Sequence, residues 1–388
     1  MGIGLSKATP TAAAAAPASR HPLWSDLPTD LAGVVLLRLP SHADRVRFSS
    51  VCRQWRHAAT TAPPPLPPAL PWLNFHDGTL QSFPGGERRR FSRLNRYTIC
   101  AGSSVGGWLL FRRPGRIPRR RHYLKNPLTG DVVRLPGHCD DPTGSPTAYF
   151  YICKVIVCGG GGGLVVGRIS YRHDNADDVV ACCRPGTSPS WSAGPWEGKC
   201  YHDMAFHDGR IYTVAGRGDL FAHEITIHKR TQQPMVSDLA TQIIQVGLFE
   251  SFFLDSSYAA TRCERLHYLV VSNEHSKLWM VRWIIPYRHE MKMGFRVLEA
   301  DMEARRWTDV ESLGDEAIFV STSCSMAVRA SSYGGYVEAG KIYFADYERR
   351  QEWPIDSTCG VYDLRSKTIS PGGPHISDRS SATWFFPR

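Results

Sequence analysis

The order of hydrophobic and polar positions divides the chain into two parts. Across residues 24–59, apolar side chains such as Leu31, Val34 and Val35 recur at the spacing of one helix face. After Pro71, short runs that alternate apolar and polar residues are separated by Gly, Asp, Asn and Pro, a texture typical of antiparallel strands and their turns. The pattern predicts a small all-α module followed by an all-β domain.

The first expected helix has clear start and stop signals. Pro28 suits the first helical position, where its missing N–H is no loss. Asp30 then places a negative charge at the positive end of the helix dipole. The apolar stripe extends to Leu39, and Pro40 ends the helix because a proline cannot continue the hydrogen-bond ladder.

Two further short helices are expected in the same module. Ser41 is suited to cap the second helix, with Asp44 as its capping-box partner. Val51 and Trp55 are four residues apart and are expected to share a face of the third helix. Folded units below about 40 residues usually need a partner, a metal or crosslinks, and this module has no ligand cluster. We therefore expect a docking module that folds against another protein.

This helical module resembles the F-box. Leu27-Pro28 opens the motif, a Leu/Val run follows, and the segment 51–56 (VCRQWR) closes it. The resemblance implies docking on a Skp-type adaptor, which is itself bound to a cullin-RING ubiquitin ligase. The alternative is a three-helix cap on the domain that follows. The residues expected to contact the adaptor are Leu27, Pro28, Leu31, Val34, Val35, Leu39, Val51 and Trp55.

The all-β part consists of segments that echo one another. Residues 208–225, 264–285 and 339–350 share a turn, a strand with an aromatic residue, and a polar turn. Many short strands fit a pair of packed sheets or a propeller, and the echoes favour the propeller. Blades usually run about 40–50 residues, so six or seven blades are expected. A short helix is expected near Leu239–Phe249.

The same part resembles the KIB-type β-propeller, a plant domain of unknown function. The segments that carry this resemblance are 102–111, 124–136, 340–346, 360–364 and 383–387. The combination with the F-box wording "ADRVRFSSVCRQWR" is similar to cereal F-box proteins. The resemblance implies a fold class of a three-helix F-box followed by a β-propeller of irregular, kelch-like repeats.

The expected domains follow one another with a linker between them. Residues 1–22 are rich in Ala and Pro and are predicted to be disordered. The F-box is expected at 23–60, a stiff proline-rich linker at 61–71 and the propeller at 72–388. The first residues fit the N-myristoylation pattern with Gly2 as acceptor, so membrane contact is expected only if Gly2 is acylated.

The net charge is +10, and much of it is local, with one arginine-rich segment at 112–121. It is expected to be an exposed loop, dispensable for folding, between a strand ending at Phe111 and one beginning near Tyr123. A solvated surface is the simplest interpretation; an acidic or phosphorylated target, or nuclear import, are alternatives. Nucleic-acid binding is the alternative function. The arginines concerned are Arg112, Arg113, Arg116, Arg119, Arg120 and Arg121.

The sequence contains no recognisable catalytic or metal motif. The glycine run 159–163 lacks the Lys-Ser/Thr of a phosphate-binding loop and predicts a hairpin tip. His202-Asp203 and His207-Asp208 could suggest acid–base or metal chemistry. However, the alternation of Met204 and Phe206 between them favours a strand that begins a blade.

The cysteine spacing and the N-terminal sequence indicate in which compartment the protein is found. Eleven cysteines are scattered without zinc-site spacing, and there is no signal peptide, so a cytoplasmic or nuclear protein is expected. No cofactor, metal or catalytic residue is expected, although an enzyme in the propeller channel is a third class. The F-box resemblance implies a non-catalytic substrate receptor of an SCF (Skp–cullin–F-box) E3 ubiquitin ligase, whose propeller captures a protein target.

Overall fold

The computed structural model describes most of the chain, with gaps at the N-terminus and in several loops. The N-terminal helices form one compact unit, and residues 67–388 with residues 40–42 form another. Within the described ranges, no helix is long and apolar enough to cross a membrane. The described ranges are 24–61, 66–86, 88–90, 98–113, 121–140, 146–147, 150–158, 163–171, 178–247, 263–286, 293–345, 359–371 and 382–387.

The helical unit contains a short 3-10 turn and the three expected helices. Pro28 lies one residue before the first helix and caps it, rather than occupying the first helical position; its carbonyl accepts the Ala32 N–H at 2.9 Å. The elements are η1 (Trp24–Asp26), α1 (Thr29–Leu37), α2 (His42–Val51) and α3 (Arg53–Thr61).

The prediction that Val51 and Trp55 share one helix is wrong. Val51 is the last residue of α2, and Trp55 belongs to α3. The helical conformation is interrupted at Cys52. The sulfur of Cys52 accepts the Trp55 backbone N–H at 3.4 Å, which is one of the N–H groups in the first turn of α3 that have no partner within the helix.

A small core holds the three helices together. Ala32, Leu36, Phe48 and Ala58 are buried, and Trp55 stacks on the Phe48 ring at a centroid distance of 4.5 Å. The indole N–H of Trp55 also donates to the Trp24 carbonyl at 3.1 Å. Trp55 is therefore a half-buried residue of this unit, whose ring packs against the core and whose polar atom is hydrogen-bonded.

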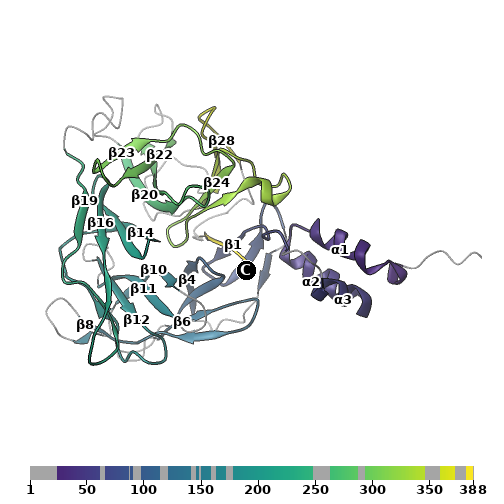
Figure 1. Ribbon diagram of the computed structural model, residues 1–388, viewed down its shortest axis with the longest axis horizontal. Helices are drawn as coiled ribbons and strands as arrows, with labels where there is room; N and C mark the ends of the chain where they lie inside the picture. The colour runs from purple at the N-terminus through teal and green to yellow at the C-terminus, as the bar shows by residue number, and fades with distance from the viewer. Residues whose placement is uncertain are drawn as a thin grey trace, which may run out of the picture. The chain divides into compact units, whose positions relative to one another are not determined.

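The second unit is a six-bladed β-propeller, with its sheets arranged around a central axis (Figure 1). This confirms the expected fold class. Blade 1 comprises β29 (Ala382–Phe385), β1 (Trp72–Phe75), β2 (Thr79–Ser82) and β3 (Arg88–Arg90). Blade 2 comprises β4 (Ile99–Ser104), β5 (Trp108–Arg113), β6 (Arg121–Lys125) and β7 (Val132–Arg134). Blade 3 comprises β10 (Tyr151–Cys158), β11 (Leu164–Ser170), β12 (Asp178–Cys183) and β13 (Ser192–Ala193).

The remaining blades continue in chain order. Blade 4 comprises β14 (Tyr201–His207), β15 (Arg210–Ala215), β16 (Asp219–His223) and β19 (Thr241–Ile244). Blade 5 comprises β20 (Cys263–Val271), β21 (Leu278–Pro286), β22 (Gly294–Asp301) and β23 (Arg306–Asp309). Blade 6 has the order β25 (Met326–Arg329), β24 (Glu316–Val320), β26 (Lys341–Ala345), β27 (Cys359–Asp363) and β28 (Thr368–Ser370).

Blade 6 departs from the simple antiparallel meander. Strands β24 and β26 pair in parallel because β25 and the 3-10 turn η2 (Ala330–Tyr333) lie between them in the chain. Two small hairpins add to the blades: β8 (Cys139–Asp140) with β9 (Pro146–Thr147), and β17 (Ile225–Ile227) with β18 (Pro234–Val236).

Two local predictions have opposite outcomes. Strands β10 and β11 pair from both sides of the glycine run, which confirms the hairpin. The helix expected near Leu239–Phe249 is wrong, because Thr241–Ile244 forms β19 and pairs with β16 as the outermost strand of blade 4. The order of the sheet overrides the local helical spacing there.

The core lies between neighbouring blades rather than at one centre. One cluster joins Leu110 and Leu124 of blade 2 to Val165 and Trp191 of blade 3. Comparable clusters join blades 3 and 4, blades 4 and 5, blades 5 and 6, and blades 6 and 1. The sheets of blades 3 to 6 therefore pack apolar side chains on both faces, which explains the nearly continuous burial of strands such as β12 and β24.

The ring is closed by the end of the chain. Strand β29 pairs antiparallel with β1, so that Trp384 faces Leu73 and Phe385 faces Trp72. Blade 1 is thus assembled from the two ends of the propeller sequence. The closure completes the four-stranded sheet of blade 1, in which β1 is paired with β2 on one side and with β29 on the other.

Candidate functional site

The helical unit presents an apolar stripe to solvent. Leu31, Val34 and Val35 occupy positions i, i+3 and i+4 of α1 and are 49%, 44% and 40% exposed. Ala32 and Leu36 on the opposite face of the same helix are buried in the core. Large apolar side chains gathered on one exposed helix face are typical of an interaction surface.

The eight residues expected to contact an adaptor divide into two groups. Pro28, Leu31, Val34, Val35 and Val51 are exposed, whereas Leu27, Leu39 and Trp55 pack against the core of the unit. Their contact with an adaptor stays a prediction. Two further exposed apolar residues of this unit were not expected from the sequence: Trp24 and Val46 are 75% and 51% exposed. The signal for Trp24 was its place three residues before the Leu-Pro opening.

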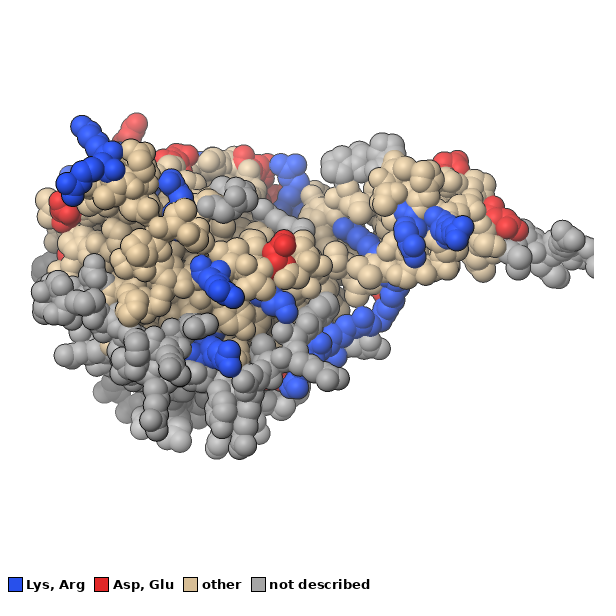
Figure 2. Space-filling view, turned by 90° about the horizontal axis from the view of Figure 1, so that it is seen from below, with Lys and Arg blue, Asp and Glu red and all other residues tan. Residues whose placement is uncertain are grey.

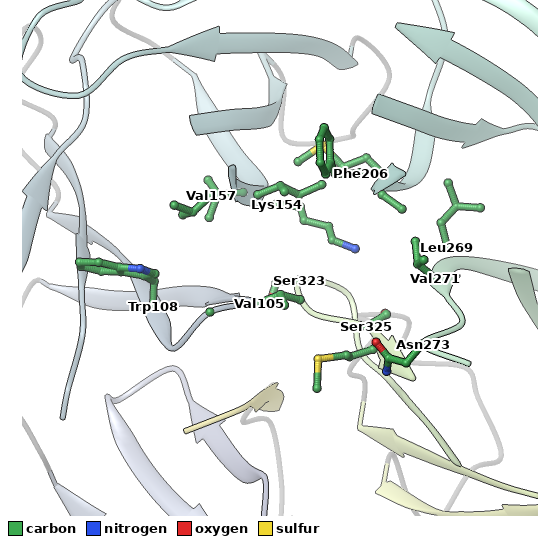
Figure 3. Close-up of a pocket in the computed structure, with 16 residues that line it drawn as sticks. Val105, Trp108, Lys154, Val157, Phe206, Leu269, Val271, Asn273, Ser323 and Ser325 are labelled. Atoms are coloured by element: carbon green, nitrogen blue, oxygen red, sulfur yellow. The ribbon is translucent and has the colours of Figure 1, made fainter. Parts of the chain in front are cut away.

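The propeller contains a cavity of about 520 Å³ that we call the central cavity. Blades 2 to 6 all contribute to its lining, with Trp108, Lys154, Phe206, Val271 and Ser323 as one example from each (Figure 3). Most of the lining is apolar, and Ser323, Ser325 and Asn273 form a polar part of the wall. Val105 and Phe206 remain more than one third exposed, so the cavity is open to solvent.

A buried ion pair joins three blades beside this cavity. Lys154 Nζ of β10 lies 2.6 Å from Asp203 Oδ1 of β14, and both side chains are almost completely buried. Asp203 also accepts the backbone N–H groups of Met204 and Leu269, each at 2.8 Å. The carboxylate therefore connects blades 3, 4 and 5 with three hydrogen bonds, which compensate for its removal from water.

Hydrogen bonds from serine hydroxyl groups connect blades 1, 2 and 6. Ser103 of blade 2 donates its backbone N–H to Ser323 Oγ at 3.1 Å and its hydroxyl to the Trp384 carbonyl. Trp384 in turn donates its backbone N–H to Ser321 Oγ at 3.2 Å. Gly102 permits this close approach, because a Cβ there would lie 2.6 Å from the Ser323 side chain.

Blades 4 and 5 share a buried chain of cationic and imidazole groups. Arg282 donates to His267 Nε2 at 3.1 Å, and His267 Nδ1 lies 2.8 Å from His202 Nδ1. Because arginine is only a donor, His267 must carry its proton on Nδ1 and donate it to His202. Burial, followed by the charge of Arg168, lowers the pKa of His202 to about 4.

A second buried histidine is held neutral in blade 4. His223 Nε2 lies 2.9 Å from Thr213 Oγ1. Burial lowers the pKa of His223 to about 4, with Lys199 acting in the same direction and Glu197 against it. Neither histidine is arranged for proton transfer to a ligand: both are partners in hydrogen bonds between or within strands.

Because His202 and His223 are buried in the neutral form, we expect the propeller to lose stability in mild acid. Their pKa values are lower in the folded chain than the ordinary value of 6.5, so the unfolded chain binds more protons below that pH. Their stabilisation is complete above pH 6.5 and is lost as the pH falls toward 4. Between pH 7 and pH 5 we expect each to lower the free energy of unfolding by about 2 kcal/mol. Urea unfolding followed by tryptophan fluorescence at both pH values measures this loss.

A pair of variants controls that measurement. His223→Gln keeps a group that can bond Thr213 but cannot titrate, so it should remove about half of the pH dependence. His275→Gln changes an exposed imidazole and should leave the pH dependence as it is. An unchanged slope in His223→Gln would contradict the assignment.

The prediction of one exposed arginine loop is partly wrong. Arg112 and Arg113 belong to β5, and Arg121 begins β6, where it pairs with Arg113. The Arg112 guanidinium lies over the Tyr151 ring, 4.8 Å from its centroid. The hairpin extends further than expected because the backbones of β5 and β6 stay paired through Arg112 with His122 and Arg113 with Arg121. Arg116, Arg119 and Arg120, like Gly2 and the tail, lie outside the described residues.

The basic groups that the structure does describe are distributed. In Figure 2, Lys and Arg side chains lie in separate small groups, with Asp and Glu among them. Some are already engaged: Arg88 lies over the Phe75 ring at 4.3 Å, and Lys341 bonds Asp363 at 2.8 Å. Among the described residues, no group of His, Cys, Asp and Glu is arranged to hold a metal ion.

A three-helix module with an exposed apolar stripe, followed in the chain by a six-bladed propeller, is the domain organisation of F-box propeller proteins. Comparison with known sequences assigns the chain to the same class. Residues 24–65 match the F-box domain, and residues 80–363 match the KIB1-4 beta-propeller. The chain belongs to the KIB1-4 β-propeller family and carries an F-box at its N-terminal end. This confirms the resemblance seen in the sequence.

Similar proteins occur in Arabidopsis thaliana. F-box protein At2g26160 is 23% identical over 346 residues, covering 85% of this chain and 97% of the relative. Putative F-box protein At3g25750 is 23% identical over 354 residues, covering 84% and 88%. F-box protein SKIP23 is 22% identical over 393 residues, covering 89% and 90%. The similarity thus extends through both units, which supports a plant origin.

Proposed function

We propose that this protein is a substrate receptor of an SCF E3 ubiquitin ligase. In this proposal the F-box binds a Skp-type adaptor, and through it a cullin-RING ligase, while the propeller binds a target protein. The observation that carries the proposal is the exposed apolar stripe of α1 on a module that matches the F-box. Relatives similar along both units are themselves F-box proteins.

The protein's own contribution to ubiquitin transfer would be proximity rather than chemistry. A receptor that holds a target beside the ligase raises its effective concentration at the reacting centre. The described polar groups of the propeller support this interpretation, because they are used in hydrogen bonds between blades 4 and 5. Asp203 accepts the Leu269 N–H, and His202 bonds His267. We place this activity in the cytoplasm or the nucleus, and the proposal assigns the protein no cofactor.

Replacement of the exposed stripe tests the proposal directly. Leu31→Asp combined with Val34→Asp should abolish co-purification of a Skp-type adaptor with the full-length chain. Burying a large apolar side chain is worth about 1.5–3 kcal/mol, and two charges in its place would have to be desolvated. We expect the dissociation constant, measured by isothermal titration calorimetry, to rise by a factor of about 100 or more.

Two controls separate docking from folding. Val132→Asp introduces one negative charge at a side chain of β7 that is 55% exposed, and it should leave adaptor binding unchanged. Trp55→Ala is a poor test because it removes the core stacking on Phe48. If the folded double variant still binds the adaptor like the wild type, the proposed docking surface is wrong.

A further inference from the structure

We propose that the central cavity binds a short peptide segment of the target through a large apolar side chain and an adjacent neutral carbonyl group. This inference rests on the proposed function as a receptor and identifies which surface of the propeller recognises the target. It is carried by three features of the cavity: its adaptable apolar wall, a buried lysine with spare donors, and its size.

The wall of the cavity has the composition of a protein-binding site. Trp108 and Phe206 contribute aromatic rings, while Met204 and Met326 contribute flexible thioether side chains that adapt to an incoming group. Aromatic residues and methionine are enriched at the centres of interfaces, where charged residues are depleted. Phe206 is 42% exposed, so the apolar surface continues from the interior to the rim, as contact with a polypeptide requires.

Lys154 supplies the polar component. Its side chain projects toward the middle of the cavity (Figure 3) and is only 6% exposed. A lysine has three N–H donors, and among the described residues Asp203 is the only acceptor bonded to Lys154. Donors left over in a buried ammonium group favour an occupant with an acceptor atom.

The charge of the site identifies the kind of acceptor. Asp203 already neutralises Lys154 at 2.6 Å, and Lys154 is the only basic residue among the described residues that line the cavity. An incoming carboxylate or phosphate would be desolvated without a cation of its own, which is costly. A neutral carbonyl oxygen, which every peptide unit provides, can accept from Lys154 without that cost.

The size of the cavity fits a segment rather than a single group. Its volume of about 520 Å³ is within the range of sites that enclose an organic ligand of moderate size, about 300–1,000 Å³. A large side chain together with the backbone that carries it fills such a space. Because five blades converge on it, one segment entering the cavity can contact most of the ring at once.

A displayed library of random short peptides, panned on the full-length chain, tests the inference. Enriched peptides should share a large aliphatic or aromatic residue, and their affinity is then measured by fluorescence polarisation. Phe206→Asp and Val105→Asp, both at exposed rim positions, should each weaken binding by about tenfold or more. Ile227→Asp, at a side chain of β17 that is 46% exposed and outside the cavity lining, should bind peptides like the wild type.

Each other result overturns the inference. Equal binding to the Phe206→Asp and Ile227→Asp variants would place recognition elsewhere, and a library without enriched peptides would exclude short segments. If the dye 8-anilinonaphthalene-1-sulfonate binds in a Phe206-dependent manner and no peptide does, the cavity is a small-molecule site instead. The Leu31→Asp/Val34→Asp variant should keep peptide binding, so failure of the adaptor interaction is distinguishable from failure of the cavity.

Discussion

Replacing Trp384 with alanine is expected to lower the free energy of unfolding of the propeller by about 3–5 kcal/mol. Trp384 is completely buried in β29, the strand that closes the ring. Its ring lies edge-on to Phe319 at 4.9 Å and to Phe83 at 5.7 Å. Alanine would leave a cavity where blades 6 and 1 meet, because the sheets around it can collapse only in part.

The loss at Trp384 also includes polar contacts. The indole N–H donates to the Val320 carbonyl of β24 at 3.1 Å, and that acceptor would lose its partner. Since folded domains are stable by only about 5–15 kcal/mol, this one change removes a large fraction of the total. Urea unfolding of the full-length chain, followed by circular dichroism, measures the change.

Trp196→Ala is the matched control. This tryptophan is 51% exposed, so its removal should change the free energy of unfolding by no more than about 0.5 kcal/mol. If the two tryptophan variants unfold at the same urea concentration, ring closure by β29 does not limit the stability of the propeller.

Asp203→Ala is expected to cost about 3–5 kcal/mol, the usual effect of removing one partner from a buried ion pair. The variant would leave the ammonium group of Lys154 buried without its counter-ion. It would also remove the acceptor for the backbone N–H groups of Met204 and Leu269. Because these contacts join blades 3, 4 and 5, we expect a lower unfolding midpoint for the whole propeller rather than for one blade.

An exposed ion pair in the same fold provides the comparison. Asp309 lies 2.7 Å from Arg296 between β22 and β23, but its side chain is 54% exposed. Asp309→Ala should therefore cost less than about 1 kcal/mol, since water solvates both charges once the pair is broken. Asp203→Ala and Asp309→Ala variants of equal stability would show that the Lys154–Asp203 pair does not hold the blades together.

The order of the elements was accessible from the sequence because it follows from local rules. Apolar residues at helical spacing before Pro40 predict α1, and alternation in runs such as Met204–Phe206 predicts strands. The sequence motifs alone indicated both the F-box and the KIB-type propeller. Local rules fail where the environment dominates: Thr241–Ile244 is a strand because blade 4 needs an outer neighbour for β16.

The candidate sites were less accessible, since the same residue type serves two purposes. Leu31 and Leu36 are both leucines of α1, but only the packing of α2 and α3 shows that Leu36 is core and Leu31 is exposed. Trp55 fits the F-box motif equally well as a docking residue or a core residue, and only the structure shows that it stacks on Phe48 and is half-buried.

The sequence by itself determined the class of each domain, because helical and strand periodicity and the F-box motif are properties of neighbouring residues. Blade number, ring closure and the central cavity depend on residues far apart in the chain. Strand β29 meets β1 across the whole propeller sequence, and Lys154, Asp203 and Leu269 come from three different blades. No local pattern encodes these contacts, since they arise only when the six sheets pack around one axis and bring their innermost strands together.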